Sequence, residues 1–181
     1  TSSRTPSIEE NSCSTLSICT EVMAAPEAVS DAAGEWFEIY NAAGHTVDLQ
    51  GLSIKGPAPD NDIFNMITST YLDPGAYLVF GANPDQKLNG GVKIDVSYGP
   101  GIKLINGGKD GLILEHSGKV IDEVIYDTKA GWPFLNGRSM NLKKGTLDAK
   151  ANDDPKNWCG AQTDMASKDK GTPGAENDSC K

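Results

Sequence analysis

The alternation of apolar and polar residues is clearest between residues 35 and 54. Along Glu35–Asn41 an extended chain would divide its side chains between two faces, with Phe37 and Ile39 on one and Trp36, Glu38 and Tyr40 on the other. Residues 41–44 are typical of a turn, in which Gly44 is free to take a positive φ. Thr46–Ile54 then continues the apolar pattern. We therefore predict a β-hairpin over residues 34–54.

Similar short segments recur along the rest of the chain. Asn106–Asp110 is a hairpin turn signal between Ile102–Ile105 and Gly111–His116, and Ser117-Gly118 is a second one that leads into Lys119–Tyr126. The alanines of Ala25–Ala33 could form a helical turn, but no segment is a convincing helix. About nine to ten short strands with turns between them predict an all-β sandwich.

Length and charge narrow the class of protein. The 181 residues suit one domain, which we place at 16–181, after a Ser/Thr-rich linker or flexible tail at 1–15. The formal net charge of −9 argues against nucleic acid as a partner, because such binding depends on Lys and Arg. Acidity suits metal cations or basic partners, although solubility is the plainer explanation. No apolar run approaches the roughly 20 residues of a membrane helix, so we expect no membrane insertion.

Four cysteines lie in pairs near the two ends of the chain. Three pairings are possible, and we favour Cys13–Cys19 with Cys159–Cys180, since each closes a short loop; end-to-end pairing is the alternative. No Cys-x-x-Cys occurs and both histidines are remote in sequence, which argues against zinc. Disulfides imply an oxidising compartment, so we expect a periplasmic, cell-surface or extracellular protein.

Several motifs together resemble those of the lamin tail domain. They are GEWFEIYN and VDLQGLSI in residues 34–54, Leu72–Phe80 (LDPGAYLVF), Arg138–Met140 (RSM), and Asn157–Cys159 (NWC) followed by Gly171–Asn177 (GTPGAEN). The resemblance covers roughly 18–177 and implies an immunoglobulin-like β-sandwich of the bacterial, secreted or surface branch. It also implies a non-catalytic binding or attachment module that recognises a protein or a glycan at the cell surface and requires no cofactor.

Catalytic motifs are missing from the sequence. There is no Gly-x-Ser-x-Gly, no His-Glu-x-x-His and no nucleotide-binding glycine pattern, and His45 and His116 lie in no motif. Glu21 and Glu38 could share one face of the sheet if their strands are neighbours in register, and one pKa of the pair would then be raised. The alternatives to a binding module are a small metal-dependent hydrolase that uses acidic residues, and a purely structural spacer.

Acidic loops offer a candidate calcium site. Calcium prefers six to eight oxygen ligands, and the candidates are Asp60 and Asp62 with Asn65, and Asn152 and Asp154 with Asn157. Neither group has the spacing of an EF-hand, and such residues also form turns and helix caps. Calcium is therefore a possible structural ion rather than a required cofactor.

Aromatic residues offer a candidate interface. Trp132 and Phe134 lie in a loop beside Gly131 and Pro133, and we predict that this pair is exposed and recognises a protein or a carbohydrate. The alternative for the other tryptophans, Trp36 and Trp158, is that they cover the ends of the sandwich.

Overall fold

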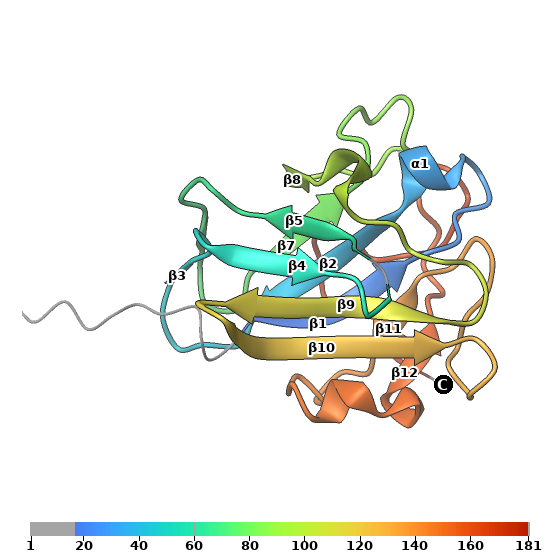
Figure 1. The fold of residues 1–181 in the computed structure, drawn as a ribbon. Helices are drawn as coiled ribbons and strands as arrows, with labels where there is room; N and C mark the ends of the chain where they lie inside the picture. Colours follow the sequence, from blue (N-terminus) through green and yellow to red (C-terminus); the bar gives the residue numbers. More distant parts are fainter. Residues whose placement is uncertain (1–16, 60, 181) are drawn as a thin grey trace, which may run out of the picture.

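The computed structural model describes residues 17–59 and 61–180, and these form a sandwich of two sheets with a small third one (Figure 1). The linker predicted at 1–15 lies outside the described residues. The strands are β1 (Ser17–Met23), β2 (Trp36–Asn41), β3 (Val47–Asp48), β4 (Leu52–Lys55), β5 (Ile63–Asn65), β6 (Tyr71–Leu72), β7 (Tyr77–Gly81), β8 (Val96–Ser97), β9 (Lys109–His116), β10 (Lys119–Asp127), β11 (Met140–Leu142) and β12 (Trp158–Gly160).

The larger sheet has the order β12-β11-β1-β2-β7-β8, and the second has the order β10-β9-β4-β5. Figure 1 shows the second sheet in front of the first. β3 and β6 form the third, two-stranded sheet. A single helical turn, α1 (Asp31–Gly34), precedes β2, and three 3₁₀ turns lie at Gly99–Gly101, Ala151–Asp153 and Pro155–Asn157. The all-β sandwich predicted from the sequence is thus confirmed.

The core lies between the two large sheets. Phe37 and Phe80, neighbours on β2 and β7, stack with their ring centroids 4.9 Å apart. Other fully buried side chains of this core come from β2, β4, β9 and β10: Ile39, Leu52, Ile54, Leu112, Leu114 and Tyr126. The predicted alternation along β2 is therefore correct for its inner face. Its outer face is also buried, and Trp36 packs there with Met23, Val79 and Val92.

The predicted hairpin over 34–54 is wrong. β2 pairs with β1 and β7, whereas β4 pairs with β5 and β9, so the two segments lie in different sheets. The Asn41 side chain holds the chain where it leaves β2. Its Nδ2 donates to the carbonyls of His45 and Leu72, and its Oδ1 accepts from the Ala43 amide. Alternating side chains are the same in a hairpin and in a crossover between sheets, so the pattern does not distinguish them.

The hairpin predicted over Leu112–Tyr126 is confirmed as β9 and β10. Ser117 and Gly118 form its turn with φ values of 51° and 74°, as a two-residue turn of the favoured hand requires. The strand predicted at Ile102–Ile105 does not form, for a reason given below.

The cysteine pairing is half as predicted. Cys159 on β12 is bonded to Cys180, which joins the end of the described chain to the edge of the larger sheet. Cys19 is a free thiol with none of its surface exposed, so the predicted Cys13–Cys19 bond is wrong for this structure. Cys13 itself lies outside the described residues. β1 directs Cys19 into the core, where its Sγ lies 4.0 Å from the Glu21 carbonyl oxygen instead of being bonded to another sulfur.

Candidate functional site

Two buried carboxyl groups face each other on neighbouring strands of the larger sheet. Glu21 on β1 is the register partner of Glu38 on β2, and both residues are 0% exposed. The condition stated for the pair, that their strands be neighbours in register, is therefore met. A bulge in β1 between Cys19 and Glu21 sets this register. The pair lies on the outer face of the sheet, away from the core that Phe37 and Ile39 fill.

Hydrogen bonds surround both carboxyl groups. Glu21 accepts from the Ser139 hydroxyl, from the Thr172 amide at 2.8 Å and from the Thr172 hydroxyl at 2.8 Å. Glu38 accepts from the Thr20 hydroxyl at 2.9 Å and from the Gly174 amide at 2.7 Å. Burial raises the pKa of Glu21 to about 7 despite these bonds. Burial, together with the neighbouring Glu21, raises the pKa of Glu38 to about 9.

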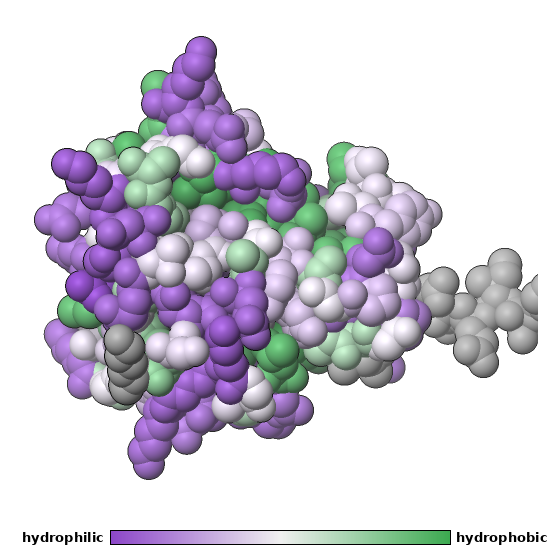
Figure 2. All heavy atoms as spheres, turned by 180° about the vertical axis from the view of Figure 1, so that it is seen from behind, coloured by the Kyte–Doolittle hydropathy of each residue, from purple (hydrophilic) through white to green (hydrophobic). Residues whose placement is uncertain are grey.

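The donors on the far side of the pair belong to one segment, Gly171–Asn177, which we call the strap. It runs over the outer face of β1 and β2, and Asn177 fastens its end by donating to the carbonyls of Thr20 and Leu142. Gly171 has no room for a side chain, since a Cβ there would lie 2.9 Å from the Trp36 ring. Hydrophilic residues cover most of this face of the molecule, with apolar ones in separate patches (Figure 2). The strap therefore closes the Glu21–Glu38 pair off from solvent, and the pair acts as a structural lock.

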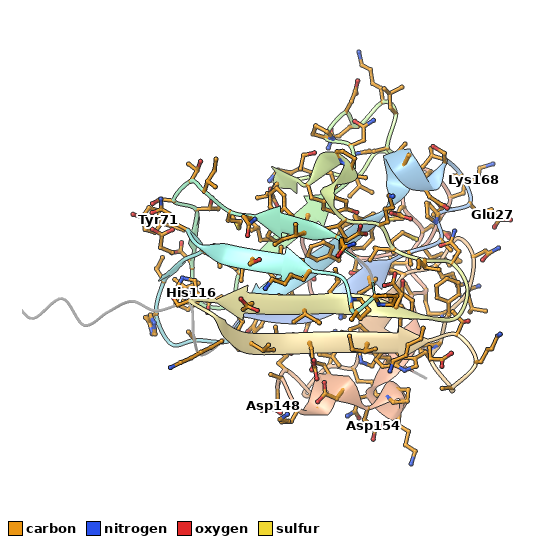
Figure 3. All side chains as sticks on the ribbon, viewed as in Figure 1. Glu27, Tyr71, His116, Asp148, Asp154 and Lys168 are labelled. Carbon is orange, nitrogen blue, oxygen red and sulfur yellow. A yellow bond between two sulfur atoms is a disulfide. The ribbon has the colours of Figure 1, made fainter. Side chains whose placement is uncertain are left out.

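The acidic loops use their side chains for hydrogen bonds within the protein. Asn152 is fully buried and its Nδ2 donates to both carboxylate oxygens of Asp122, at 3.0 and 2.9 Å. Asp154 caps a 3₁₀ turn by accepting from the Lys156 amide, and Figure 3 shows it below β10. Asp62 accepts from the Lys103 amide, far along the chain, and Asp60 lies outside the described residues. No cluster of three or more His, Cys, Asp or Glu suited to a metal occurs within the described part of the chain.

The predicted aromatic interface is not exposed. Trp132 is only 9% exposed and packs against Trp158, with ring centroids 5.6 Å apart. Phe134 is half-buried and stacks on Tyr126 at 6.0 Å. The exposure predicted for Trp132 is therefore wrong, because the loop folds back onto the core instead of projecting from it. Trp36 and Trp158 are both buried, but Trp36 packs on the outer face of the larger sheet rather than over an end of the sandwich.

A pocket of about 660 Å³ opens at the end of the sandwich where α1 leads into β2. We call it the Glu35 pocket. Apolar residues form most of its wall, and the polar lining comes from α1, from Glu35 between α1 and β2, from Asn83 after β7 and from the segment after η2 (Gly99–Gly101). Its lining residues are Asp31, Ala32, Glu35, Ala82, Asn83, Pro84, Gly99, Pro100, Ile102, Lys103, Leu104, Ile105 and Asn106.

Three carboxylates hold one wall of the pocket in place. The successive amides of Lys103, Leu104 and Ile105 donate to Asp62 at 2.7 Å, Glu35 at 3.2 Å and Asp110 at 2.6 Å. The backbone of this segment is thus bonded to side chains rather than to another strand. This is why the strand predicted at 102–105 does not form.

Glu35 is the buried polar group of the pocket. The residue is 6% exposed, and its Oε2 accepts from Leu104 while no described residue donates to Oε1. Oε1 is also not among the fully enclosed polar atoms that lack a partner, so it faces the open space of the pocket. Burial, against the Leu104 hydrogen bond and together with the charges of Asp31, Asp110 and Asp62, raises the pKa of Glu35 from 4.5 to about 7.

Comparison with known proteins identifies the family. A family model described as the Lamin Tail Domain matches residues 11–128. The chain belongs to the lamin tail domain family. Its fold is similar to that of a DUF4876 family protein from Bacteroides thetaiotaomicron VPI-5482, with a TM-score of 0.50 and 13% identity over 86% of this chain and 70% of that one. At this identity the likeness concerns the fold alone. Among the curated proteins, none matches this chain.

The lamin tail domain motifs in the sequence divide into two roles. GEWFEIYN supplies Glu35 to the pocket and Glu38 to the lock, and GTPGAEN is the strap itself. Sequence reasoning found the lock pair but missed the pocket. The available signal was Glu35 directly before an alternating strand, together with the apolar Ile102–Ile105 segment after Pro100. Nothing in the sequence alone brings these two segments together, because the contact joins residues 69 positions apart.

Proposed function

We propose that this lamin tail domain is a non-catalytic binding or attachment module of an exported or cell-surface protein. In this proposal it recognises its partner through the Glu35 pocket. The observation that carries the proposal is the pocket itself, a concave and mainly apolar site with one buried carboxyl group, which is the usual form of a binding site. The Cys159–Cys180 bond supports export, because disulfides persist in oxidising compartments.

A second observation supports binding over catalysis. The carboxyl pair that a hydrolase could use, Glu21 and Glu38, is fully buried under the strap, and its oxygens are bonded to the protein. Two acidic neighbours of Glu35, Asp62 and Asp110, use their carboxylates to accept hydrogen bonds from the backbone of the pocket wall. No helix in the described residues is long and apolar enough to cross a membrane.

Array binding with a pocket-blocking variant tests the proposal. The labelled protein is applied to peptide and glycan arrays beside Ala32→Trp, which places an indole at the pocket mouth from an exposed position of α1. Ala175→Trp on the strap, also exposed, is the matched control. We expect ligands that wild type and Ala175→Trp retain and Ala32→Trp loses. If no ligand on either array is sensitive to Ala32→Trp, the proposal fails.

Carbohydrate recognition at a second place is the other candidate function. A polar groove of about 380 Å³ includes Tyr71, Tyr77, Asp73 and Asp95 in its lining. Tyr71 is 69% exposed and Figure 3 shows it projecting from the end of the molecule opposite Glu27, where a sugar ring could stack on it. Glycan binding that Tyr71→Ala abolishes and Ala32→Trp leaves intact would favour this groove. Ile67→Ala, at a residue 83% exposed, is the control for a lost apolar surface.

A further inference from the structure

We propose that the Glu35 pocket takes a basic side chain, lysine or arginine, of a protein partner, with the methylene stem against the apolar wall and the cationic end at Glu35 Oε1. This inference rests on the proposed function and adds the chemical class of the ligand. It follows from the form of the wall, from the arrangement of charges and from what the lining lacks.

The wall matches the stem of a long basic side chain. Ile102 and Leu104 are buried in it, while Ile105 at the rim is 43% exposed. Lysine and arginine place their methylene groups along apolar surface and keep the charged end at a polar group. A mainly apolar lining that includes one buried carboxyl group, Glu35, provides both kinds of surface.

The charges around the pocket attract a cation. Glu35 lies at the buried end and Asp31 at the exposed mouth, where its Oδ2 accepts from the Asn106 side chain at 2.8 Å. Among the described lining residues Lys103 is the basic one, and its side chain is exposed. The whole chain carries a net charge of −9, so a basic partner would also be drawn to this surface from a distance.

Glu35 Oε1 is the atom that would receive the partner. No donor to Oε1 occurs among the described residues, and such an oxygen gains most from a charged donor, since hydrogen bonds to ionised groups are roughly twice as strong as neutral ones. An anionic ligand would meet Glu35, Asp31 and the nearby Asp62 and Asp110. A sugar would find no aromatic ring to stack on among the described residues of the lining. The pocket therefore favours a cation over either alternative.

Binding of a cation should depend on pH in one direction. The groups that face Glu35 are Asp31, Asp62, Asp110, Lys103 and Tyr98, whose hydroxyl donates to the Glu35 carbonyl. The pKa of Glu35 is about 7, so the carboxylate form grows as pH rises through neutrality, while a lysine partner stays protonated. Affinity for a lysine peptide should therefore rise between pH 6 and pH 8.

A pair of peptides tests the inference directly. The probes are acetyl-Gly-Leu-Lys-Leu-Gly-amide and the same peptide with norleucine in place of lysine. Each is titrated into ¹⁵N-labelled protein, and the amide resonances of Leu104 and Ile105 report on the pocket wall. We expect the lysine peptide to bind at least about tenfold more tightly, as for a charge-assisted hydrogen bond. Glu35→Gln should remove this preference and the pH dependence. Glu123→Gln, which removes one exposed carboxylate on β10, should keep both.

The outcomes separate this inference from the proposed function. Equal or tighter binding of the norleucine peptide would overturn the cation and leave the pocket as a binding site. A lysine preference that survives in Glu35→Gln would overturn the role of Glu35. If neither peptide binds while an array ligand is lost in Ala32→Trp, the basic side chain is wrong and the proposed function stands. If no ligand of any kind is sensitive to Ala32→Trp, both fail together.

Discussion

Glu21 and Glu38 are cross-strand partners on β1 and β2, and neither has any exposed surface. Two carboxyl groups this close cannot both ionise cheaply inside a protein, so the pair holds a proton at neutral pH. The strap makes this arrangement possible, since its amides at Thr172 and Gly174 donate to one carboxyl group each. The strap is thus bound to two carboxyl groups, Glu21 and Glu38, that titrate. Its attachment to the sheet therefore depends on pH.

The first prediction concerns the stability of the Glu38→Gln variant at alkaline pH. The pKa of Glu38 is raised from 4.5 to about 9, so the folded protein holds this proton more tightly than the unfolded chain. Its contribution to stability is complete below about pH 4.5 and is lost as pH rises toward 9. Glutamine keeps the shape of the protonated acid without the titration. We expect similar unfolding free energies near pH 4.5, and a variant that becomes steadily more stable than wild type as pH rises from there to about 9.

Urea denaturation at pH 5.5, 7, 8.5 and 10 measures this effect. Each group titrating only in the unfolded state contributes a slope of at most about 1.4 kcal/mol per pH unit. Glu21, Glu35 and Asp122, each with its pKa raised to about 7, should give both proteins a decline up to that pH. Glu123→Gln removes an exposed carboxylate and should follow wild type throughout. Parallel curves for wild type and Glu38→Gln between pH 5.5 and 8.5 would contradict the prediction.

The second prediction concerns the attachment of the strap. Thr172→Val keeps the volume of the side chain and removes its hydroxyl bond to Glu21. Because the acceptor is a buried carboxyl group, we expect the unfolding free energy to fall by about 1–3 kcal/mol. Hydrogen exchange should also become faster at the Gly174 amide, which is bonded to Glu38 in the same segment.

The matched control for Thr172→Val is Thr68→Val, at an exposed threonine. It should change stability by no more than about 0.5 kcal/mol. The interpretation of the strap as a lock is wrong if the two valine variants have the same stability and the Gly174 amide exchanges at the wild-type rate in both.

Much of the fold followed from local pattern, and the parts that did not have a common cause. The β9–β10 hairpin and the alternation of Phe37 and Ile39 depend on residues close in sequence, and both were predicted correctly. The crossover after β2 and the burial of Trp132 depend on contacts with distant segments. Residues 102–105, in the wall of the pocket, have the apolar pattern of a strand. Three carboxylates from other segments nevertheless accept the hydrogen bonds of their amides.

The same reasoning divides the two candidate sites. Strand periodicity places each carboxyl group of the Glu21–Glu38 pair on a face, but the sequence left open whether the two strands are neighbours in register. The Glu35 pocket was missed because its parts come from α1, β2 and the segment after η2, and packing rather than periodicity joins them. Concave sites made from loops leave little trace in a single sequence.

The third prediction concerns whether Asn152 is a calcium ligand or a structural hydrogen-bond donor. Its amide donates to Asp122, which in turn accepts from the Cys19 amide at 2.7 Å. Asn152→Asp would replace the donor by a second carboxyl group beside Asp122, whose pKa burial already raises to about 7. We expect a loss of about 3 kcal/mol, because a buried donor is removed and a like charge is added.

Thermal melts with a chelator and then with calcium check this. Asn152→Asp should melt lower than wild type in both conditions, whereas Asp154→Asn, at an exposed cap, should melt close to wild type. A calcium site at these residues predicts the reverse, since an added carboxylate strengthens calcium binding and bound ion raises the melting temperature by mass action. Calcium-dependent rescue of Asn152→Asp would therefore restore calcium as the hypothesis for this loop.

The fourth prediction concerns the bond between Cys159 and Cys180, which are 21 residues apart. The loop that it closes contains the whole strap, so the bond limits how far the strap can move when the Glu21–Glu38 lock opens. For a loop of this length the chain-entropy model gives about 3 kcal/mol of stabilisation. We expect the double variant Cys159→Ser/Cys180→Ser to lose about this much in urea denaturation, and reduction of wild type to have the same effect.

Cys19→Ala, at a buried free thiol, controls for the loss of sulfur without loss of a cross-link. In the double variant the Thr172 amide should exchange faster than in Cys19→Ala, because strap opening then no longer works against a closed loop. Equal urea midpoints and equal Thr172 exchange in the two proteins would show that the lock alone holds the strap.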